Sequence, residues 1–216
     1  MSAGQAAVRP PPDEIAMIIA SSTGNLPEVK RLIDQGMDLD HHDFTGNTPL
    51  IYAARYARVD LVQFLLNHGA DVNASTHWGT TALKESVRKG NRVVVRALLD
   101  AGADVDQTDN LHESAVFDAV KYRRLWAVDM LLARHAHVNI RNDQGYTPMM
   151  YAIEQHQARI QAVLVQKSGE ENVSLKYGIM SSSVAAPPTR TVSNEVRQDM
   201  DLGGRGRSAP IASLIR

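Results

Sequence analysis

The sequence predicts an all-α fold, a solenoid of stacked helix–turn–helix units joined by β-turn or hairpin connections. Three observations support this prediction. Short motifs recur along the chain, apolar residues within each recurrence fall at helical spacing, and glycines recur where helices should end. A chain built in this way buries its apolar residues between neighbouring units.

The recurring motifs have a period of 33 residues. Gly46 and Gly145 begin similar motifs with Thr-Pro two residues later, and they lie three such steps apart. Gly79 and His112 stand at the two intermediate steps. A second motif, Gly-Ala-Asp-Val-Asn at 69–73, recurs with the same period. The period divides most of the chain into five units, at about 10–42, 43–75, 76–108, 109–141 and 142–168.

Each unit has the signals of two helices and a turn. Thr48 is expected to cap a helix that begins at Pro49, where the missing proline N–H costs nothing. A second helix places Leu65 and its apolar neighbours on one face. Gly69 follows this helix, where a left-handed residue can end it. Residues 70–79 are then expected to form an extended, turned connection.

The ends of the chain lack the period. We expect a flexible N-terminus at 1–12, a repeat domain at 13–168 and a mostly disordered tail at 169–216, which is rich in Ser, Pro, Gly and Arg. The first and last units are expected to act as caps. The last unit carries polar side chains, among them Gln157 and Gln161, where a solenoid needs a polar outer face.

A 33-residue period with Thr-Pro-Leu and Gly-Ala-Asp-Val-Asn resembles the ankyrin repeat family, with about five repeats followed by a C-terminal tail. One departure concerns the histidine that often follows Thr-Pro-Leu in that family. Ile51, Lys84, Phe117 and Met150 stand in this position. The departure affects a local hydrogen-bond pattern and leaves the expected fold unchanged.

In the resembling family, partner-binding positions lie on the turn before the capped helix and at the end of that helix, and together they line a concave groove. Carried onto this sequence, they give twelve candidate partner-binding residues: Phe44, Arg55, Tyr56, His77, Trp78, Arg88, Lys89, Leu111, Lys121, Tyr122, Tyr146 and His156. Tyrosine, tryptophan and arginine are enriched in binding hot spots. The groove is therefore expected to be aromatic and mildly basic, with Glu113 and Asp143 opposing its cations.

Three functional readings follow. The first is a non-enzymatic protein–protein interaction module, or scaffold, that binds a protein or peptide of acidic character in its groove. The second is a regulatory or effector protein whose tail carries the activity while the repeats dock it to a target. The third, nucleic-acid binding, conflicts with the formal net charge of −1. The aromatic residues of the groove also have a purely structural explanation, packing between adjacent turns.

Composition and motifs argue against other classes. The chain has no cysteine, so thiolate metal sites and cysteine nucleophiles are excluded. None of the eight histidines has the spacing of a helical ligand pair, and no nucleophile elbow or phosphate-binding loop is present. We expect no enzyme, no metal, no cofactor and no membrane association. We expect a monomer in the cytoplasm, with the nucleus as a further location in a eukaryote.

Overall fold

The computed structural model describes residues 12–168 and contains ten α-helices and no strand within them. They are α1 (Pro12–Thr23), α2 (Leu26–Asp34), α3 (Pro49–Arg55), α4 (Val59–Asn67), α5 (Ala82–Lys89), α6 (Arg92–Asp100), α7 (Ala115–Lys121), α8 (Leu125–Leu132), α9 (Pro148–Glu154) and α10 (Ala158–Ser168). The expected N-terminal segment, except Pro12, and the expected tail lie outside the described residues.

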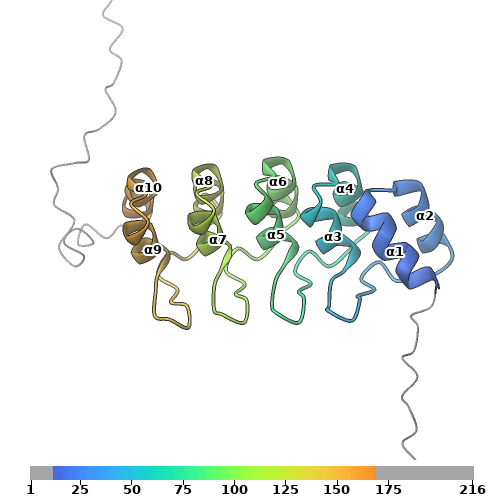
Figure 1. Cartoon of the computed structure of the whole chain (residues 1–216). Helices are drawn as coiled ribbons and strands as arrows, with labels where there is room; N and C mark the ends of the chain where they lie inside the picture. The colour runs from blue at the N-terminus through green and yellow to red at the C-terminus, as the bar shows by residue number, and fades with distance from the viewer. Residues whose placement is uncertain (1–11, 169–216) are drawn as a thin grey trace, which may run out of the picture. The chain divides into compact units, whose positions relative to one another are not determined.

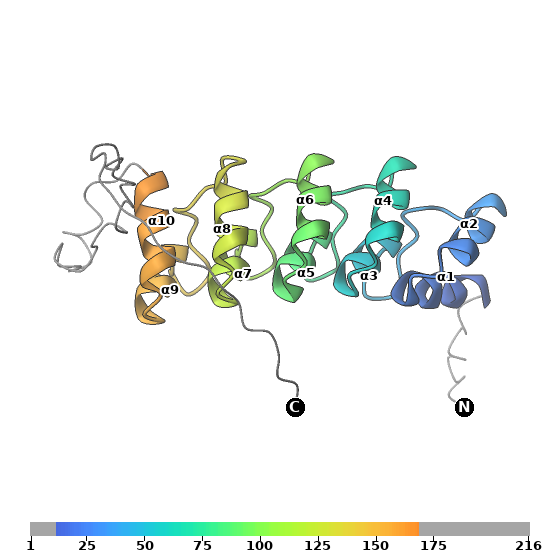
Figure 2. The same ribbon diagram turned by 90° about the horizontal axis from the view of Figure 1, so that it is seen from above.

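The helices form five antiparallel pairs that stack in one row (Figures 1 and 2). Each odd-numbered helix packs against the even-numbered helix that follows it and against the next odd-numbered helix. The even-numbered helices from α4 to α10 pack against one another in the same order. Loops project from the stack beside the odd-numbered helices (Figure 1). The predicted all-α solenoid is therefore confirmed.

A column of leucines runs through the second helix of every pair. Leu32, Leu65, Leu98, Leu131 and Leu164 are each separated by one period, and each is at most 1% exposed. The smaller Ala, Ser or Val side chains around them let the helices approach closely. One continuous core thus extends through all five units, and each unit contributes to it only next to its neighbours.

The first helices of three units begin at capping threonines. The hydroxyl oxygens of Thr48, Thr81 and Thr147 accept hydrogen bonds from the backbone N–H three residues later. Ser114 holds the equivalent place in the fourth unit, but its side chain makes no capping bond. The cap and the proline expected at the start of the second unit are both present.

Two histidines adopt the left-handed backbone that glycine holds elsewhere. His112 has φ 56° and His135 has φ 62°, while Gly79 and Gly102, one period earlier, have φ 74° and 86°. These positions therefore require a left-handed residue, as the period predicts. A third left-handed position follows the first helix of each pair, and three of its non-glycine occupants are Ala57, Arg123 and His156.

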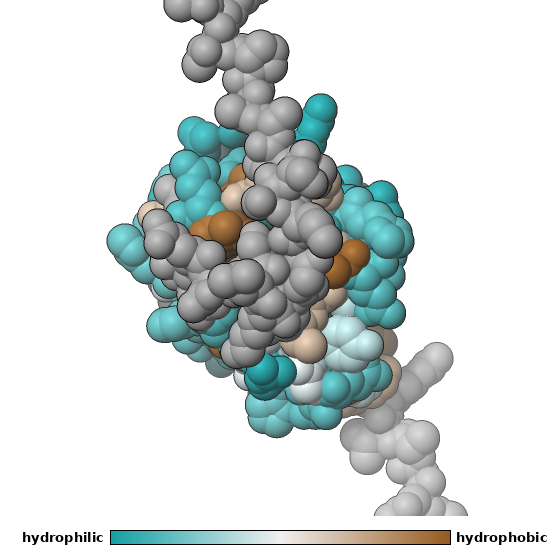
Figure 3. Space-filling model, turned by 90° about the vertical axis from the view of Figure 1, so that its left-hand side faces the viewer, coloured by the Kyte–Doolittle hydropathy of each residue, from teal (hydrophilic) through white to brown (hydrophobic). Residues whose placement is uncertain are grey.

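The last unit closes the stack only partly with polar side chains. Arg159 and Gln166 are exposed, and hydrophilic side chains surround the end of the stack with apolar patches between them (Figure 3). Gln157, expected on the outer face, is instead buried, and its Nε2 donates to the backbone oxygen of Val120 in the preceding unit. Among the described helices, none is long and apolar enough to cross a membrane.

Candidate functional site

Four similar turns precede the first helices of units two to five, and we call them fingers 2 to 5. They comprise residues 43–47, 76–80, 109–113 and 142–146. In each finger the first residue supplies a side-chain oxygen that accepts two backbone N–H groups of the same turn. These residues are Asp43, Thr76, Asp109 and Asn142. The turn therefore holds its shape through its own first side chain.

Backbone hydrogen bonds link each finger to the next. The N–H of His77 donates to the oxygen of Thr45 at 3.0 Å, and that of Asn110 donates to the oxygen of Trp78 at 3.0 Å. The same bond, from Asp143 to Leu111, joins fingers 4 and 5 at 3.1 Å. Because these bonds use only main-chain atoms, the side chains at the finger tips project freely.

Close approach between fingers requires glycine at two positions. A Cβ atom on Gly46 would lie 2.8 Å from the backbone nitrogen of His77. A Cβ on Gly79 would lie 2.7 Å from the Cα of Asp109. Both distances are shorter than real Cβ contacts. These glycines therefore set the spacing between fingers 2, 3 and 4.

Most of the exposed apolar side chains of the described residues lie on the fingers or beside them. Of eight large hydrophobic side chains that are exposed, five lie on finger tips or directly after odd-numbered helices: Phe44, Tyr56, Trp78, Leu111 and Tyr122. We call the area formed by the fingers and the C-terminal ends of these helices the finger surface. Of the other three, Ile15 and Ile19 lie on α1, the first helix of the stack, and Val93 lies on α6 in the other row of helices.

The structure places the predicted aromatic residues and their neighbours on this surface. Phe44, Trp78 and Leu111 project from finger tips, and Phe44 is 91% exposed. Tyr56 and Tyr122 are the C-cap residues that directly follow α3 and α7. The remaining members are His77 and His156, both exposed, and Tyr146, which is half-buried in finger 5. Packing between turns does not account for the exposed members.

The predicted cations differ from expectation. Arg55 lies 3.4 Å from Glu85, Arg88 lies 3.2 Å from Asp118, and Lys121 lies 2.5 Å from Glu113. Within the described residues, Lys89 is the one predicted cation for which no carboxylate partner is found. The expectation of a mildly basic groove is therefore wrong. Besides Glu113, which is expected to oppose the cations, buried Glu85 and Asp118 neutralise two more of the four.

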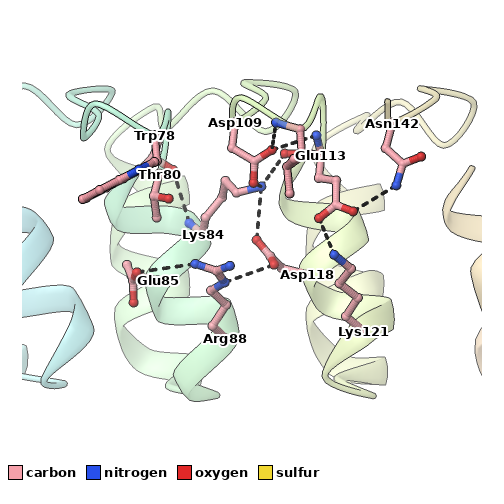
Figure 4. Close-up of polar contacts among 12 residues, drawn as sticks. Trp78, Thr80, Lys84, Glu85, Arg88, Asp109, Glu113, Asp118, Lys121 and Asn142 are labelled. Atoms are coloured by element: carbon pink, nitrogen blue, oxygen red, sulfur yellow. Dashed lines mark hydrogen bonds and ion pairs between the residues drawn. The ribbon is translucent and has the colours of Figure 1, made fainter. Parts of the chain in front are cut away.

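Lys84 is the centre of a buried ion network between units three and four (Figure 4). Its side chain is 1% exposed, and its Nζ lies 3.1 Å from Asp109 Oδ2 and 3.2 Å from Asp118 Oδ2. The same ammonium donates to the backbone oxygen of Glu113. Arg88 joins the network through Asp118. A buried ammonium is tolerated here because carboxylates and a carbonyl surround it.

The network shifts the pKa values of its carboxyls in opposite directions. Burial raises the pKa of Asp118 above its ordinary value, although Lys84 and Arg88 act against this shift. Burial also disfavours the ionised form of Asp109, but the charge of Lys84 and several hydrogen bonds outweigh it and lower the pKa. Arg88 keeps its charge, since neighbouring Asp118 raises its pKa in spite of burial. The two aspartates therefore differ in how firmly they hold their charge.

A second polar centre lies at finger 2. The phenol of Tyr52 donates to Asp43 at 2.7 Å, and the Asp43 carboxylate also accepts from Thr45 and Asn47. These bonds outweigh burial and hold the pKa of Asp43 well below its usual range. Burial and the bond to Asp43 raise the pKa of Tyr52 to about 12. Asp43 therefore fixes the finger to α3.

A cavity of about 440 Å³ opens between fingers 3 and 4 on the finger surface. Trp78 and Leu111 form its apolar walls. Its other lining residues include Arg55, Glu85 and Arg88, which belong to the ion pairs described above. This volume lies within the range of small-ligand sites and accommodates one or two side chains.

The sequence contains a signal for the buried network that the candidate set does not use. Lys84 stands in a periodic position that Ile51 and Phe117 hold in neighbouring units, and both of those are fully buried. A lysine there must be buried as well, so it needs acidic partners. Asp118, at the next position of the period in the following unit, and Asp109, the first residue of finger 4, supply them.

Histidine–carboxylate pairs occur singly on the surface. His112 Nδ1 lies 2.6 Å from Asp143, and His137 Nδ1 lies 2.5 Å from Asp106. In residues 12–168, no cluster of three or more His, Asp or Glu side chains has the arrangement of a metal site.

Comparison with known proteins agrees with this architecture. A family model described as ankyrin repeats, in three copies, matches residues 5–76 and 73–142. No curated protein matches the chain significantly. The matched segments include fingers 2 to 4 and the cavity between fingers 3 and 4.

Proposed function

Because the chain belongs to the ankyrin-repeat family, whose repeats are generally non-enzymatic protein–protein interaction modules, we propose that it binds a segment of a partner protein on the finger surface. One observation carries this proposal. Five of the eight large hydrophobic side chains that are exposed among the described residues lie on that surface. Exposed apolar groups gathered in one area mark interaction sites more often than singly scattered ones do.

The proposed mechanism is recognition by a rigid surface. The ladder of backbone bonds between fingers fixes the tips before a partner arrives, so little conformational entropy is lost on binding. Trp78 and Leu111 supply apolar anchors in adjacent units. Charge contributes less than the sequence suggests, and an acidic residue of the partner is favoured chiefly beside Lys89. The affinity therefore rests on apolar contact.

Trp78→Ala tests the proposal. The side chain is 59% exposed, so its loss should leave folding stability within about 0.5 kcal/mol of the native chain. Loss of an interfacial anchor should weaken a partner complex by about 2 kcal/mol or more. The measurement is quantitative affinity capture from a lysate of the source organism, with the native chain and the variant compared side by side, and with thermal unfolding as the folding check.

Val93→Ala is the matched control, because it removes an exposed apolar side chain from α6, outside the finger surface. The proposal predicts at least one protein that is captured equally by the native chain and by Val93→Ala but in a smaller amount by Trp78→Ala. Equal capture by all three chains contradicts the proposal. A loss of stability in Trp78→Ala with intact binding makes Trp78 a packing residue. The monomeric state and the cytoplasmic location stay predictions, which sedimentation and cell fractionation check.

A further inference from the structure

We propose that the cavity between fingers 3 and 4 takes an uncharged part of the partner: one apolar or aromatic side chain against Trp78 and Leu111, with a neighbouring backbone carbonyl directed at the arginines. This inference rests on the proposed function and deepens it, since it names the chemistry of the partner at one place on the finger surface.

The apolar requirement follows from the walls of the cavity. Trp78 is 59% exposed and Leu111 is 56% exposed, and they line the same cavity from adjacent fingers. A side chain placed between them removes apolar area from water on both walls. The cavity of about 440 Å³ holds a ring or a branched aliphatic group together with part of its backbone.

The requirement for an uncharged partner follows from the neutral floor. The cations Arg55, Lys84 and Arg88 are joined to an equal number of carboxylates, those of Glu85, Asp109 and Asp118. The ion-pair distances are 3.1–3.6 Å. A partner carboxylate entering this cavity meets no net positive charge, and it gives up its hydration. A backbone carbonyl has far less hydration to lose.

The arginines nevertheless keep hydrogen-bonding capacity. Arg88 donates from Nε to Asp118 and turns Nη1 toward Glu85, while no acceptor is found for its Nη2 within the described residues. In Arg55, Nε faces Glu85 and Nη2 donates to Asn47, while no acceptor is found for Nη1 within the described residues. Each guanidinium carries five N–H donors. Both arginines therefore have a donor available for a carbonyl oxygen, held in place by the carboxylates beneath.

The test is a selection of short random peptides on the full-length chain, followed by affinity measurements on the enriched sequences. The expected peptides share one aromatic or large aliphatic position and show no enrichment of Asp or Glu at its neighbours. Their affinity should change by less than about twofold between about 0.1 M and about 1 M salt, across which the Debye length falls from about 10 Å to about 3 Å. Trp78→Ala and Leu111→Ala should each lower it by about tenfold or more, and Val93→Ala should not.

Glu85→Gln adds a gain-of-function arm. Glu85 is the carboxylate that Arg55 and Arg88 share, so its neutral analogue should leave the cavity cationic. This variant should select peptides with Asp or Glu beside the apolar residue, and their affinity should fall as salt rises. Circular dichroism confirms its fold. If the variant does not fold, the salt series and the two alanine variants still decide the question.

Two results overturn the inference. One is enrichment of acidic, salt-sensitive peptides by the native chain. The other is enrichment of peptides whose affinity is unchanged by Trp78→Ala and Leu111→Ala but is lowered by Phe44→Ala or Tyr56→Ala. In that case the proposed function stands, but the peptides bind elsewhere on the finger surface and not in this cavity. If no peptide is enriched, the inference falls, and the capture experiment alone decides the proposed function.

Discussion

His112 and His135 hold backbone conformations that glycine holds in neighbouring units, but their surroundings differ. His112 pairs with Asp143, so its side chain contributes a contact between fingers 4 and 5. The side chain of His135 makes no hydrogen bond or ion pair that is found among the described residues, and only its backbone N–H donates, to the oxygen of Leu132. At Gly102, one period earlier, an added Cβ would meet nothing within 4 Å. The cost at His135 is therefore backbone strain alone.

His135→Gly should raise the free energy of unfolding by about 1 kcal/mol, because a left-handed conformation costs a residue with a Cβ roughly that amount more than glycine. Urea denaturation measures the change. His112→Gly is the comparison, and its free energy of unfolding should rise less because this variant also loses the pair with Asp143. A lower denaturation midpoint for His135→Gly means that the imidazole makes a stabilising contact.

Lys84 shows at the same scale how a buried charge depends on its partners. Lys84→Met should lower the free energy of unfolding by about 3–5 kcal/mol, because Asp109 and Asp118 then remain buried without their shared cation. The matched control is Lys89→Met on the same helix, where the lysine is exposed, and it should change stability by less than about 0.5 kcal/mol. A loss below about 1 kcal/mol for Lys84→Met indicates that water or a rearrangement compensates the aspartates.

At the scale of the element, finger 2 depends on one carboxylate. Asp43 accepts bonds from Tyr52, Thr45 and the backbone of Asn47, and its pKa is lowered in the fold. A carboxyl with a lowered folded-state pKa stabilises the fold above its ordinary pKa of about 4. This contribution is lost as the pH falls below that value.

Asp43→Asn should therefore destabilise the chain by about 1–3 kcal/mol at neutral pH, the range for hydrogen bonds to a charged group. The difference from the native chain should shrink as the pH falls below about 4, because the carboxyl of the unfolded native chain then takes up a proton while the folded carboxyl, with its lowered pKa, does so only at still lower pH. Denaturation across a pH series measures both chains. Asp71→Asn, on an exposed residue outside the fingers, is the control. A difference that stays constant down to low pH means that ionisation of Asp43 does not stabilise the finger.

The elements follow from the sequence more fully than the site does. The period locates the helices, the capping threonines and the exposed positions of Trp78 and Tyr122, because these depend on local chemistry that each unit repeats. The ion network does not follow in the same way. It joins Lys84 of one unit to Asp118 of the next, so it depends on which residues differ between units. Arg55 and Arg88 look basic in the sequence because their carboxylate partners, Glu85 and Asp118, occupy a position of the period that is not acidic in every unit. In the second unit Tyr52 holds that position.

At the scale of the whole molecule, stability passes from unit to unit. The main contacts of each helix pair are with its neighbours in the stack, and the network around Lys84 crosses the boundary between units three and four. Weakening that boundary leaves three units on one side and two on the other. Two repeats alone bury too little core to be stable.

In Lys84→Met, the backbone amides of α7 to α10 should therefore exchange with solvent faster, relative to the native chain, than those of α1 to α4. Hydrogen exchange followed by mass spectrometry measures both halves in one experiment. The Lys89→Met chain should show the native pattern. An equal acceleration along the whole stack means that the five units unfold as one cooperative block, with no weaker boundary.

The backbone hydrogen bonds between the fingers hold neighbouring units together without using the side chains at the finger tips, so these side chains can vary. Mutations at the tips, such as positions 44, 78 and 111, leave every rung of the ladder in place, whereas a mutation at Gly46 or Gly79 obstructs it. Duplicated genes can therefore diverge in binding preference through single tip substitutions without passing through unfolded intermediates. For the same reason, combinatorial libraries randomised at these tips and constant at the glycines should remain largely folded, so the scaffold can be retargeted in the laboratory.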